Sequence, residues 1–168
     1  MAHVLITGMT MSGKTTLARE LARQYQAQGV PVIVLDPIRD RQWTTCADYV
    51  TDNSADFMQV VMGSQSCAVM VDEAGEAVGQ YAREMFSLAT RARHLGHRSH
   101  FLSQRPAQIN PTVRDQCSRL YLFAMNADTC KLLSRDWNAP AILKGSDLDQ
   151  GEYISVPRFG EPRFSAIF

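Results

Sequence analysis

Short apolar runs alternate with segments of helical periodicity along the chain. The runs at 30–35 and 67–71 are apolar on both faces, as buried parallel strands are. Three further apolar runs have the length of strands, which gives five predicted strands in all: 3–7, 30–35, 67–71, 99–103 and 119–123. The pattern therefore predicts a buried, mainly parallel sheet.

Helical spacing separates these runs. Leu17, Leu21 and Tyr25 recur four residues apart and predict a helix over 14–28, which stops at Gly29. Other segments are predicted to be helical, the last of them a short piece opened by Asn110-Pro111: 56–62, 77–92, 127–135 and the residues after 110. Regular alternation of strand and helix predicts a three-layer α/β fold with helices on both faces of a parallel sheet.

The C-terminal 18 residues, 151–168, have the pattern of two short strands around a turn at Phe159-Gly160. We therefore expect a short C-terminal β extension of the sheet. No repeat, low-complexity tract or linker divides the 168 residues, so a single domain over 1–168 is predicted.

Composition changes this picture little. Hydrophobic residues make up 45% and charged residues 20%, as in ordinary globular proteins. The chain has no apolar run of ~18 residues and no signal-peptide pattern, so we expect no membrane span and a cytoplasmic location. The four cysteines lack metal-site spacing, which favours free thiols.

The charge is more informative in its distribution than in its sum. Because its net charge is zero, the chain as a whole is not a basic nucleic-acid binder. Seven arginines nevertheless concentrate in one stretch and could present a positive face to an anion. They are Arg83, Arg91, Arg93, Arg98, Arg105, Arg114 and Arg119.

A phosphate-binding motif follows the first predicted strand and opens the first helix. Residues 8–15, GMTMSGKT, fit the P-loop pattern GxxxxGK followed by Ser or Thr. We expect Lys14 to reach the β- and γ-phosphates of ATP and the Thr15 hydroxyl to ligate Mg²⁺. The predicted nucleotide-binding residues are Gly8, Met9, Thr10, Met11, Ser12, Gly13, Lys14, Thr15 and Thr16.

Acidic and amide side chains follow two other strands. Asp72 and Glu73 end the run 67–71, where Asp72 can hold the Mg²⁺ water shell and Glu73 can polarise an attacking water. Gln104 follows the run 99–103, and an amide there can contact both the water and the γ-phosphate. These positions favour hydrolysis over transfer to a substrate hydroxyl.

With these residues in place, the chain resembles the FtsK–HerA division of additional-strand P-loop ATPases, especially viral genome-packaging ATPases. The resemblance is carried by GMTMSGKT, by VMVDEAGE, and by the stretch from residue 90 to residue 123 that contains Gln104. It spans roughly residues 2–123. Residues 128–168 match nothing in the family's pattern.

The resemblance implies a sheet order of 5-1-4-3-2 for the five predicted strands. It also implies a homo-oligomeric ring, hexamer or pentamer, with Mg-ATP between subunits and an arginine finger from the neighbour. Arg93 is favoured for the finger, with Arg91 and Arg98 as alternatives. The implied function is packaging or movement of DNA, with double-stranded DNA favoured, in the host cytoplasm or at a virion vertex with a portal or capsid partner.

Two other functions stay open. A nucleotide or small-metabolite kinase is similarly short, but no lid with paired arginines is evident in the sequence. A nucleotide-switched assembly factor resembling the Zot-like proteins of filamentous phages shares the P-loop and the acidic strand, but generally needs a membrane segment.

Several aromatic and histidine residues have two interpretations each. Trp137 could cover the adenine, and Trp43 could stack on a base or pack against a helix. The tail aromatics Phe159, Phe164 and Phe168 fit either a sheet edge or a strand that docks on a neighbour. His94, His97 and His100 are spaced by three, but a helix end between them argues against a metal site.

Overall fold

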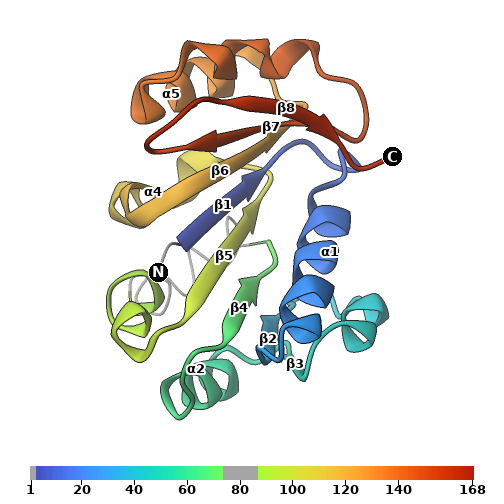
Figure 1. Cartoon of the computed structure of the whole chain (residues 1–168), viewed down its shortest axis with the longest axis vertical. Helices are drawn as coiled ribbons and strands as arrows, with labels where there is room; N and C mark the ends of the chain where they lie inside the picture. The colour runs from blue at the N-terminus through green and yellow to red at the C-terminus, as the bar shows by residue number, and fades with distance from the viewer. Residues whose placement is uncertain (1–2, 74–86) are drawn as a thin grey trace.

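A computed structural model describes residues 3–73 and 87–168 of the chain. One eight-stranded sheet, in the order β3-β2-β4-β5-β1-β6-β7-β8, runs through the molecule (Figure 1). The strands are β1 (His3–Thr7), β2 (Val32–Leu35), β3 (Tyr49–Thr51), β4 (Ala68–Val71), β5 (Arg98–Ser103), β6 (Cys117–Phe123), β7 (Glu152–Pro157) and β8 (Arg163–Ala166).

The predicted order 5-1-4-3-2 is confirmed for the five predicted strands, which are β6-β1-β5-β4-β2 in the sheet. All neighbours among these five pair in parallel. The predicted C-terminal extension is also confirmed, because β7 and β8 continue the sheet beside β6 as antiparallel strands. The three-residue strand β3, which pairs with β2, was not predicted.

Helices cover both faces of the sheet (Figure 1). They are α1 (Lys14–Ala27), α2 (Ser54–Met62), α4 (Pro111–Gln116) and α5 (Ala127–Trp137), with 3-10 segments η1 (Arg41–Thr45), η2 (Ala92–Leu95), η3 (Pro106–Gln108) and η4 (Pro140–Asp147). Of the predicted helix 77–92, residues 77–86 lie outside the described residues, and residues 87–90 are helical.

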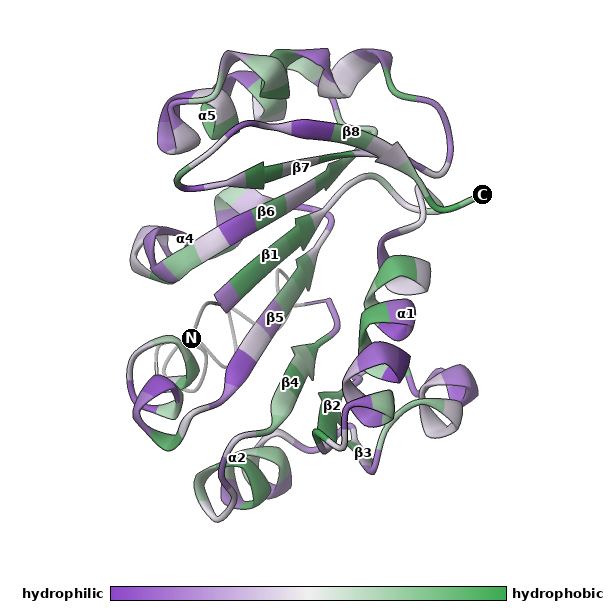
Figure 2. Cartoon of the chain, viewed as in Figure 1, coloured by the Kyte–Doolittle hydropathy of each residue, from purple (hydrophilic) through white to green (hydrophobic). Residues whose placement is uncertain are grey.

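Each buried strand divides its side chains between two apolar clusters. Val4 and Ile6 of β1 pack with Leu17 and Ala18 of α1, whereas Leu5 joins the cluster on the other face. That second cluster also contains residues of α2, α4 and α5. In consequence, the residues of β4 and most of those of β1 are hydrophobic along the strand (Figure 2). Among the described residues, no helix is long and apolar enough to cross a membrane.

The parallel strands give the sheet two distinct edges. The loops after β1, β4 and β5 meet at the carboxyl ends of the strands, which we call the carboxyl edge. Because β7 runs antiparallel to β6, its beginning and the end of β8 lie at this same edge. The opposite end, where β5 and β6 begin, is the amino edge.

Candidate functional site

The P-loop lies between β1 and α1 at the carboxyl edge, as predicted. Its turn needs glycine at two positions. A Cβ on Gly8 would lie 2.5 Å from the Cβ of Phe123, and Gly13 has a φ of 115°. The backbone N–H of Met9 donates to the carbonyl of Ala124 at 2.9 Å, which ties the loop to the end of β6.

Lys14 is the buried cation of this loop. Its ammonium group donates a hydrogen bond of 3.0 Å to the carbonyl oxygen of Met9. The residue as a whole is 5% exposed. Burial lowers the pKa of Lys14, while the nearby carboxylates of Glu73 and Asp72 raise it. The Lys14 ammonium therefore lies near the Met9 carbonyl of the P-loop and near the carboxylates of Glu73 and Asp72.

Asp72 and Glu73 follow β4 at the same edge. Asp72 is buried, and its Oδ2 accepts a hydrogen bond of 3.0 Å from the indole Nε1 of Trp43. Burial raises the pKa of Asp72 to about 6, and the bond from Trp43 opposes that rise. Glu73 has a φ of 51°, an unusual backbone conformation for a glutamate, which turns it away from the strand direction.

Gln104 connects the P-loop with Glu73. Its Oε1 accepts a hydrogen bond of 2.7 Å from the Thr10 hydroxyl, and its Nε2 donates to Glu73 Oε1 at 2.9 Å. The connection is possible because β5, which carries Gln104, lies between β1 and β4. Sequence positions 10, 73 and 104 are thereby joined in one polar chain.

A magnesium site fits the oxygen donors present. Asp72 is a buried carboxylate beside Glu73 and Asp36, so a cation there would offset the repulsion among the three. The hydroxyl of Thr15 and the carboxylate of Asp72 are the ligand types that Mg²⁺ prefers. Thr15 also lines a cavity of about 300 Å³ with Lys14 and Thr16.

Residues 149–168 also contribute to this site, which their sequence did not predict. The N–H of Gly151 donates to the carbonyl of Ser12 at 3.0 Å, and Gln150 Nε2 donates to the carbonyl of Met11 at 3.0 Å. Gln150 and Phe168 line the same cavity as Thr15. The C-terminal hairpin is therefore a wall of the P-loop site, and no local sequence pattern indicates it.

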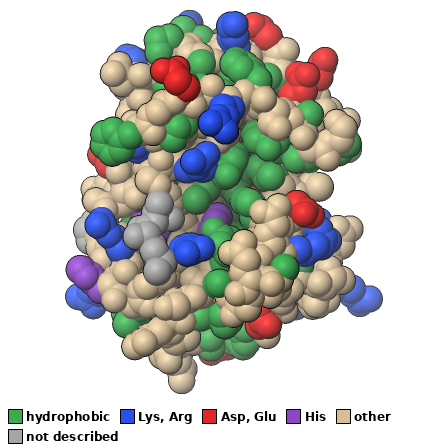
Figure 3. Space-filling view, viewed as in Figure 1, with side chains coloured by type: hydrophobic (Ala, Val, Ile, Leu, Met, Phe, Trp, Pro, Cys, Tyr) green, Lys and Arg blue, Asp and Glu red, His purple; other side chains and the backbone are tan. Residues whose placement is uncertain are grey.

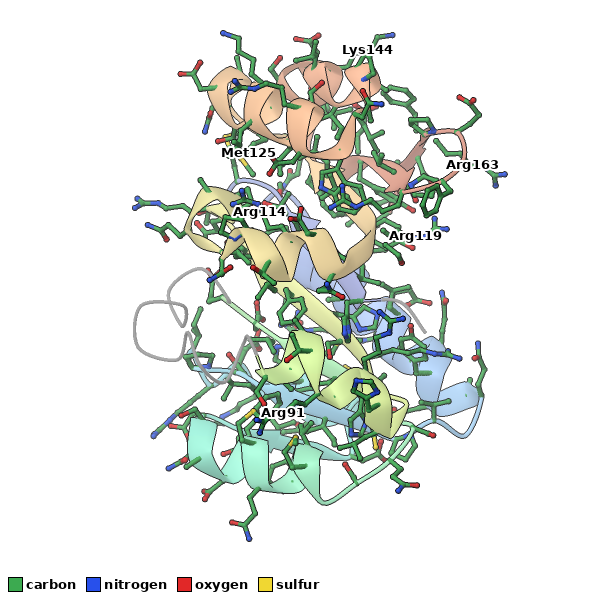
Figure 4. The ribbon with its side chains drawn as sticks, turned by 90° about the vertical axis from the view of Figure 1, so that its left-hand side faces the viewer. Arg91, Arg114, Arg119, Met125, Lys144 and Arg163 are labelled. Atoms are coloured by element: carbon green, nitrogen blue, oxygen red, sulfur yellow. The ribbon has the colours of Figure 1, made fainter. Side chains whose placement is uncertain are left out.

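The three candidates for the arginine finger lie at the amino edge. Arg91 and Arg93 are exposed at η2, at the amino edge, so they face away from the chain's own P-loop. Arg98, the first residue of β5, is half-buried, and its guanidinium lies 5.6 Å from the centre of the Tyr25 ring. Figure 4 shows the amino edge with Arg91, Arg114 and Arg119 labelled.

The predicted positive face is only partly present. Arg114 is buried and donates to the carbonyls of Pro106 and Ile109 at 3.0 Å each, besides pairing with Asp136. It therefore supports the fold. Arg98 and Arg119 do reach the surface, where they line a cavity of about 220 Å³ on the side of α1. Figure 3 shows basic side chains spread over this face, interspersed with apolar and acidic ones.

Two other sequence interpretations are decided by contacts. The Trp137 ring lies 3.8 Å from the Arg158 guanidinium and lines a cavity with Cys117, at the amino edge, so it does not cover the nucleotide site. His97 accepts from the Cys67 N–H and contacts the carbonyl of Val61, which gives it a structural role. Among residues 3–73 and 87–168, no metal-binding cluster of His, Cys, Asp and Glu is present.

Known proteins resemble this chain in the P-loop segment and in the fold. The family model for adenylylsulphate kinase matches residues 1–45, which contain β1, the P-loop and α1. Curated protein sequences give no match. The genome packaging NTPase B204 from Sulfolobus turreted icosahedral virus 2, in complex with ATP-gammaS, has a TM-score of 0.83 at 16% identity, covering 99% of this chain and 98% of that one.

Two further solved structures are also similar. VirB4 of Thermoanaerobacter pseudethanolicus has a TM-score of 0.74 at 11% identity, covering 99% of this chain and 89% of that one. The pCW3 conjugation coupling protein TcpA has a TM-score of 0.73 at 16% identity, covering 98% of this chain and 59% of that one. The chain thus has a P-loop ATPase fold, and the predicted resemblance to FtsK–HerA ATPases is confirmed at the level of the fold.

Proposed function

We propose that this chain hydrolyses Mg-ATP and uses the energy to move or package DNA. The observation that carries the proposal is the polar chain from Thr10 through Gln104 to Glu73. It places an amide and a carboxylate beside the P-loop, where the γ-phosphate of a bound nucleotide would lie. The folds of a genome packaging NTPase and of a conjugation coupling protein support the choice of DNA as the partner.

In the proposed reaction, a water oxygen attacks the γ-phosphorus and the bond to the β,γ-bridging oxygen breaks. Glu73 accepts the proton of that water, and the Gln104 amide orients it. Lys14 and the P-loop amides stabilise the charge on the phosphate oxygens. Bound Mg²⁺, held by Thr15 and Asp72, would neutralise the β- and γ-phosphates. The products are ADP and inorganic phosphate.

The site needs a second copy of the chain. Arg91 lies just before η2, Arg93 in η2 and Arg98 at the start of β5, all at the amino edge, whereas the P-loop is at the carboxyl edge. Only a neighbouring subunit could therefore bring one of these three arginines to the γ-phosphate. The resulting head-to-tail contact generates a ring when its rotation closes. We assign the finger to Arg93 and the ring to a hexamer or pentamer, acting in the host cytoplasm with a portal or capsid partner.

The kinase alternative has little support. The adenylylsulphate kinase match ends at residue 45, before Asp72, Glu73 and Gln104, so it covers only the phosphate-binding part of the site. A kinase would transfer phosphate to an added acceptor, whereas the proposed motor transfers it to water. Measuring phosphate release with and without candidate acceptors separates the two.

The experiment that tests hydrolysis is Glu73→Gln. The variant should bind ATP and release phosphate at least about 10²-fold more slowly, because a general base has been lost. Glu20→Gln is the control, since Glu20 is an exposed residue of α1 whose carboxylate pairs with Arg23 across one helical turn. Full turnover by Glu73→Gln would remove Glu73 as the base.

DNA dependence is tested on the wild-type chain. Phosphate release should rise when double-stranded DNA is added, and the stimulation should weaken as salt increases, because phosphate contacts release counterions. Phosphate release that is indifferent to both DNA and salt would contradict the motor and leave only an ATPase.

A further inference from the structure

Two large apolar side chains flank the cavity beside the P-loop. Met11 is 80% exposed and Phe168 is 79% exposed. Both line the cavity of about 300 Å³ that Gly13, Thr15 and Thr16 also line. Its volume lies at the lower end of the range for small-molecule sites. Exposed apolar surface at the mouth of a polar cavity indicates that a ligand with an apolar part covers it.

The position of the Phe168 ring is fixed by the chain beneath it. A Cβ on Gly151 would lie 2.4 Å from Cε2 and 2.7 Å from Cζ of that ring, so the ring packs directly on the glycine backbone. The preceding residue, Ile167, donates its N–H to the carbonyl of Gly151 at 3.0 Å. One side of the ring is therefore supported, and most of its surface remains open to solvent.

The supporting backbone is joined to the P-loop. Gly151 donates its N–H to the Ser12 carbonyl, and Gln150 donates its side-chain N–H to the Met11 carbonyl. Met11 itself has a φ of 61°, which the bond from Gln150 helps to hold. The backbone that supports the aromatic ring is thus hydrogen-bonded to the phosphate loop that carries Met11.

The direction of the site follows from the P-loop. The predicted path of the triphosphate places the γ-phosphate near Glu73 and Gln104, on the β4–β5 side of the loop. Thr16, Gln150 and Phe168 lie on the other side, toward β7 and β8. The nucleoside end of the ligand must leave the loop on that side, where the two apolar side chains are.

We infer that Phe168 is the stacking platform for the purine base of the bound nucleotide, with Met11 as the opposing apolar contact. The inference rests on the proposed ATP binding and deepens it by assigning the base subsite to the C-terminal hairpin. An aromatic ring binds a base through its π-face. Stacking on this ring gives a purine more contact area than a pyrimidine and gives nothing to a ligand without a base.

The test compares Mg-ATPγS with inorganic triphosphate as ligands of the full chain. Phe168→Ala should weaken the nucleotide on the order of tenfold and leave triphosphate binding unchanged. Phe159→Ala is the matched control, because Phe159 is 96% exposed at the turn of the same hairpin, near the amino edge. It should change neither affinity.

Phe168→Trp provides a second, spectroscopic measurement. The native tryptophans are almost fully buried, Trp43 at 0% and Trp137 at 4% exposure, so the new indole would dominate the exposed emission. The fluorescence of this indole should be quenched by Mg-ATPγS and not by triphosphate. The affinity of the variant for the nucleotide should match or exceed that of the wild type.

Other outcomes overturn the inference. Equal weakening of both ligands by Phe168→Ala would mean that the ring only supports the P-loop, and unchanged binding of both would place the base elsewhere. A wild-type chain that bound triphosphate but gained nothing from the base would also contradict it. A wild-type chain that bound neither ligand would contradict the proposed function itself, and this inference with it.

Discussion

The indole Nε1 of Trp43 donates a hydrogen bond of 3.0 Å to the buried carboxylate of Asp72. The indole belongs to η1, which follows β2, whereas Asp72 follows β4. The Arg19 guanidinium of α1 lies 5.4 Å from the centre of the indole ring and pairs with Asp40 at the start of η1. Trp43 therefore positions the predicted Mg²⁺ ligand, and does not stack on a base.

Trp43→Phe should keep the packing and lose that hydrogen bond. Loss of a bond to a charged group costs about 1.5–3 kcal/mol of unfolding free energy. We also expect the Mg²⁺ concentration for half-maximal phosphate release to rise several-fold, since the Asp72 side chain is no longer held. Trp137→Phe is the control, because the Trp137 Nε1 has no hydrogen-bond partner in the described structure. An unchanged Mg²⁺ requirement in Trp43→Phe would assign Trp43 to the core alone.

Gln104→Glu tests the connection between the P-loop and Glu73. The substitution replaces the amide donor with a second carboxylate, so the bond to Glu73 becomes a repulsion. ATP affinity should fall as well, because the added charge also faces the γ-phosphate, while phosphate release at saturating ATP should fall by about 10²-fold. Gln108→Glu in η3 adds the same charge at an exposed position and should have no effect. Phosphate release that survives Gln104→Glu would mean that the amide is not needed to orient the water.

Alanine substitutions at Gly13 and Gly29, two glycines with positive φ, distinguish the effect of steric crowding from that of backbone strain. Gly13→Ala would place a Cβ 2.6 Å from Ile167 Cδ1 at a φ of 115°, whereas the space around Gly29, with a φ of 73°, is open. Each substitution should cost about 1–2 kcal/mol for the backbone conformation. Gly13→Ala alone should also abolish ATP binding, which isothermal titration would show. Equal ATP affinity in both variants would mean that the clash between a Cβ at position 13 and Ile167 does not disturb the P-loop.

His100 should make the fold sensitive to acid. Its Nδ1 donates to the Arg98 carbonyl and its Nε2 accepts from the Tyr25 hydroxyl, so the neutral ring is held between them. Burial, with smaller contributions from His3 and Arg98, lowers the pKa of His100 to about 4, against an ordinary value of 6.5.

Between pH 6.5 and 4 the unfolded chain binds more protons at this position than the folded chain does. The free energy of unfolding therefore carries no penalty from His100 above pH 6.5, and it decreases by about 3 kcal/mol as the pH falls to 4. Urea unfolding at several pH values should show this slope, and His100→Gln should flatten it. His94→Gln, at an exposed position, should keep it. Equal slopes in His100→Gln and the wild type would assign the acid sensitivity to other groups.

The parts of the site that could be predicted consist of residues that are close to one another in the sequence. The P-loop and the pair Asp72-Glu73 are local patterns attached to apolar strands, and Gln104 follows from the order of those strands. Gln150 contacts Met11 across 139 residues, and Trp43 contacts Asp72 across 29, so no local pattern indicates either contact.

Burial explains the other differences from the sequence-based picture. Arg114 has the same local sequence signal as its exposed neighbours, but its guanidinium is satisfied by backbone carbonyls inside the fold. The strand β3 has only three residues, all half-buried, which is too short for a period-two pattern. Both features depend on how distant segments pack.

The central claim, that the catalytic site is shared between two copies of the chain, is tested by mixing two inactive variants. Lys14→Ala should lose nucleotide binding, and Arg93→Ala should bind ATP without hydrolysing it. In an equimolar mixture some interfaces combine an intact P-loop with an intact Arg93, so phosphate release should recover to a fraction of the wild-type rate. A mixture as inactive as its two components, with mixed oligomers present by size, would contradict a finger supplied by Arg93 of a neighbouring subunit.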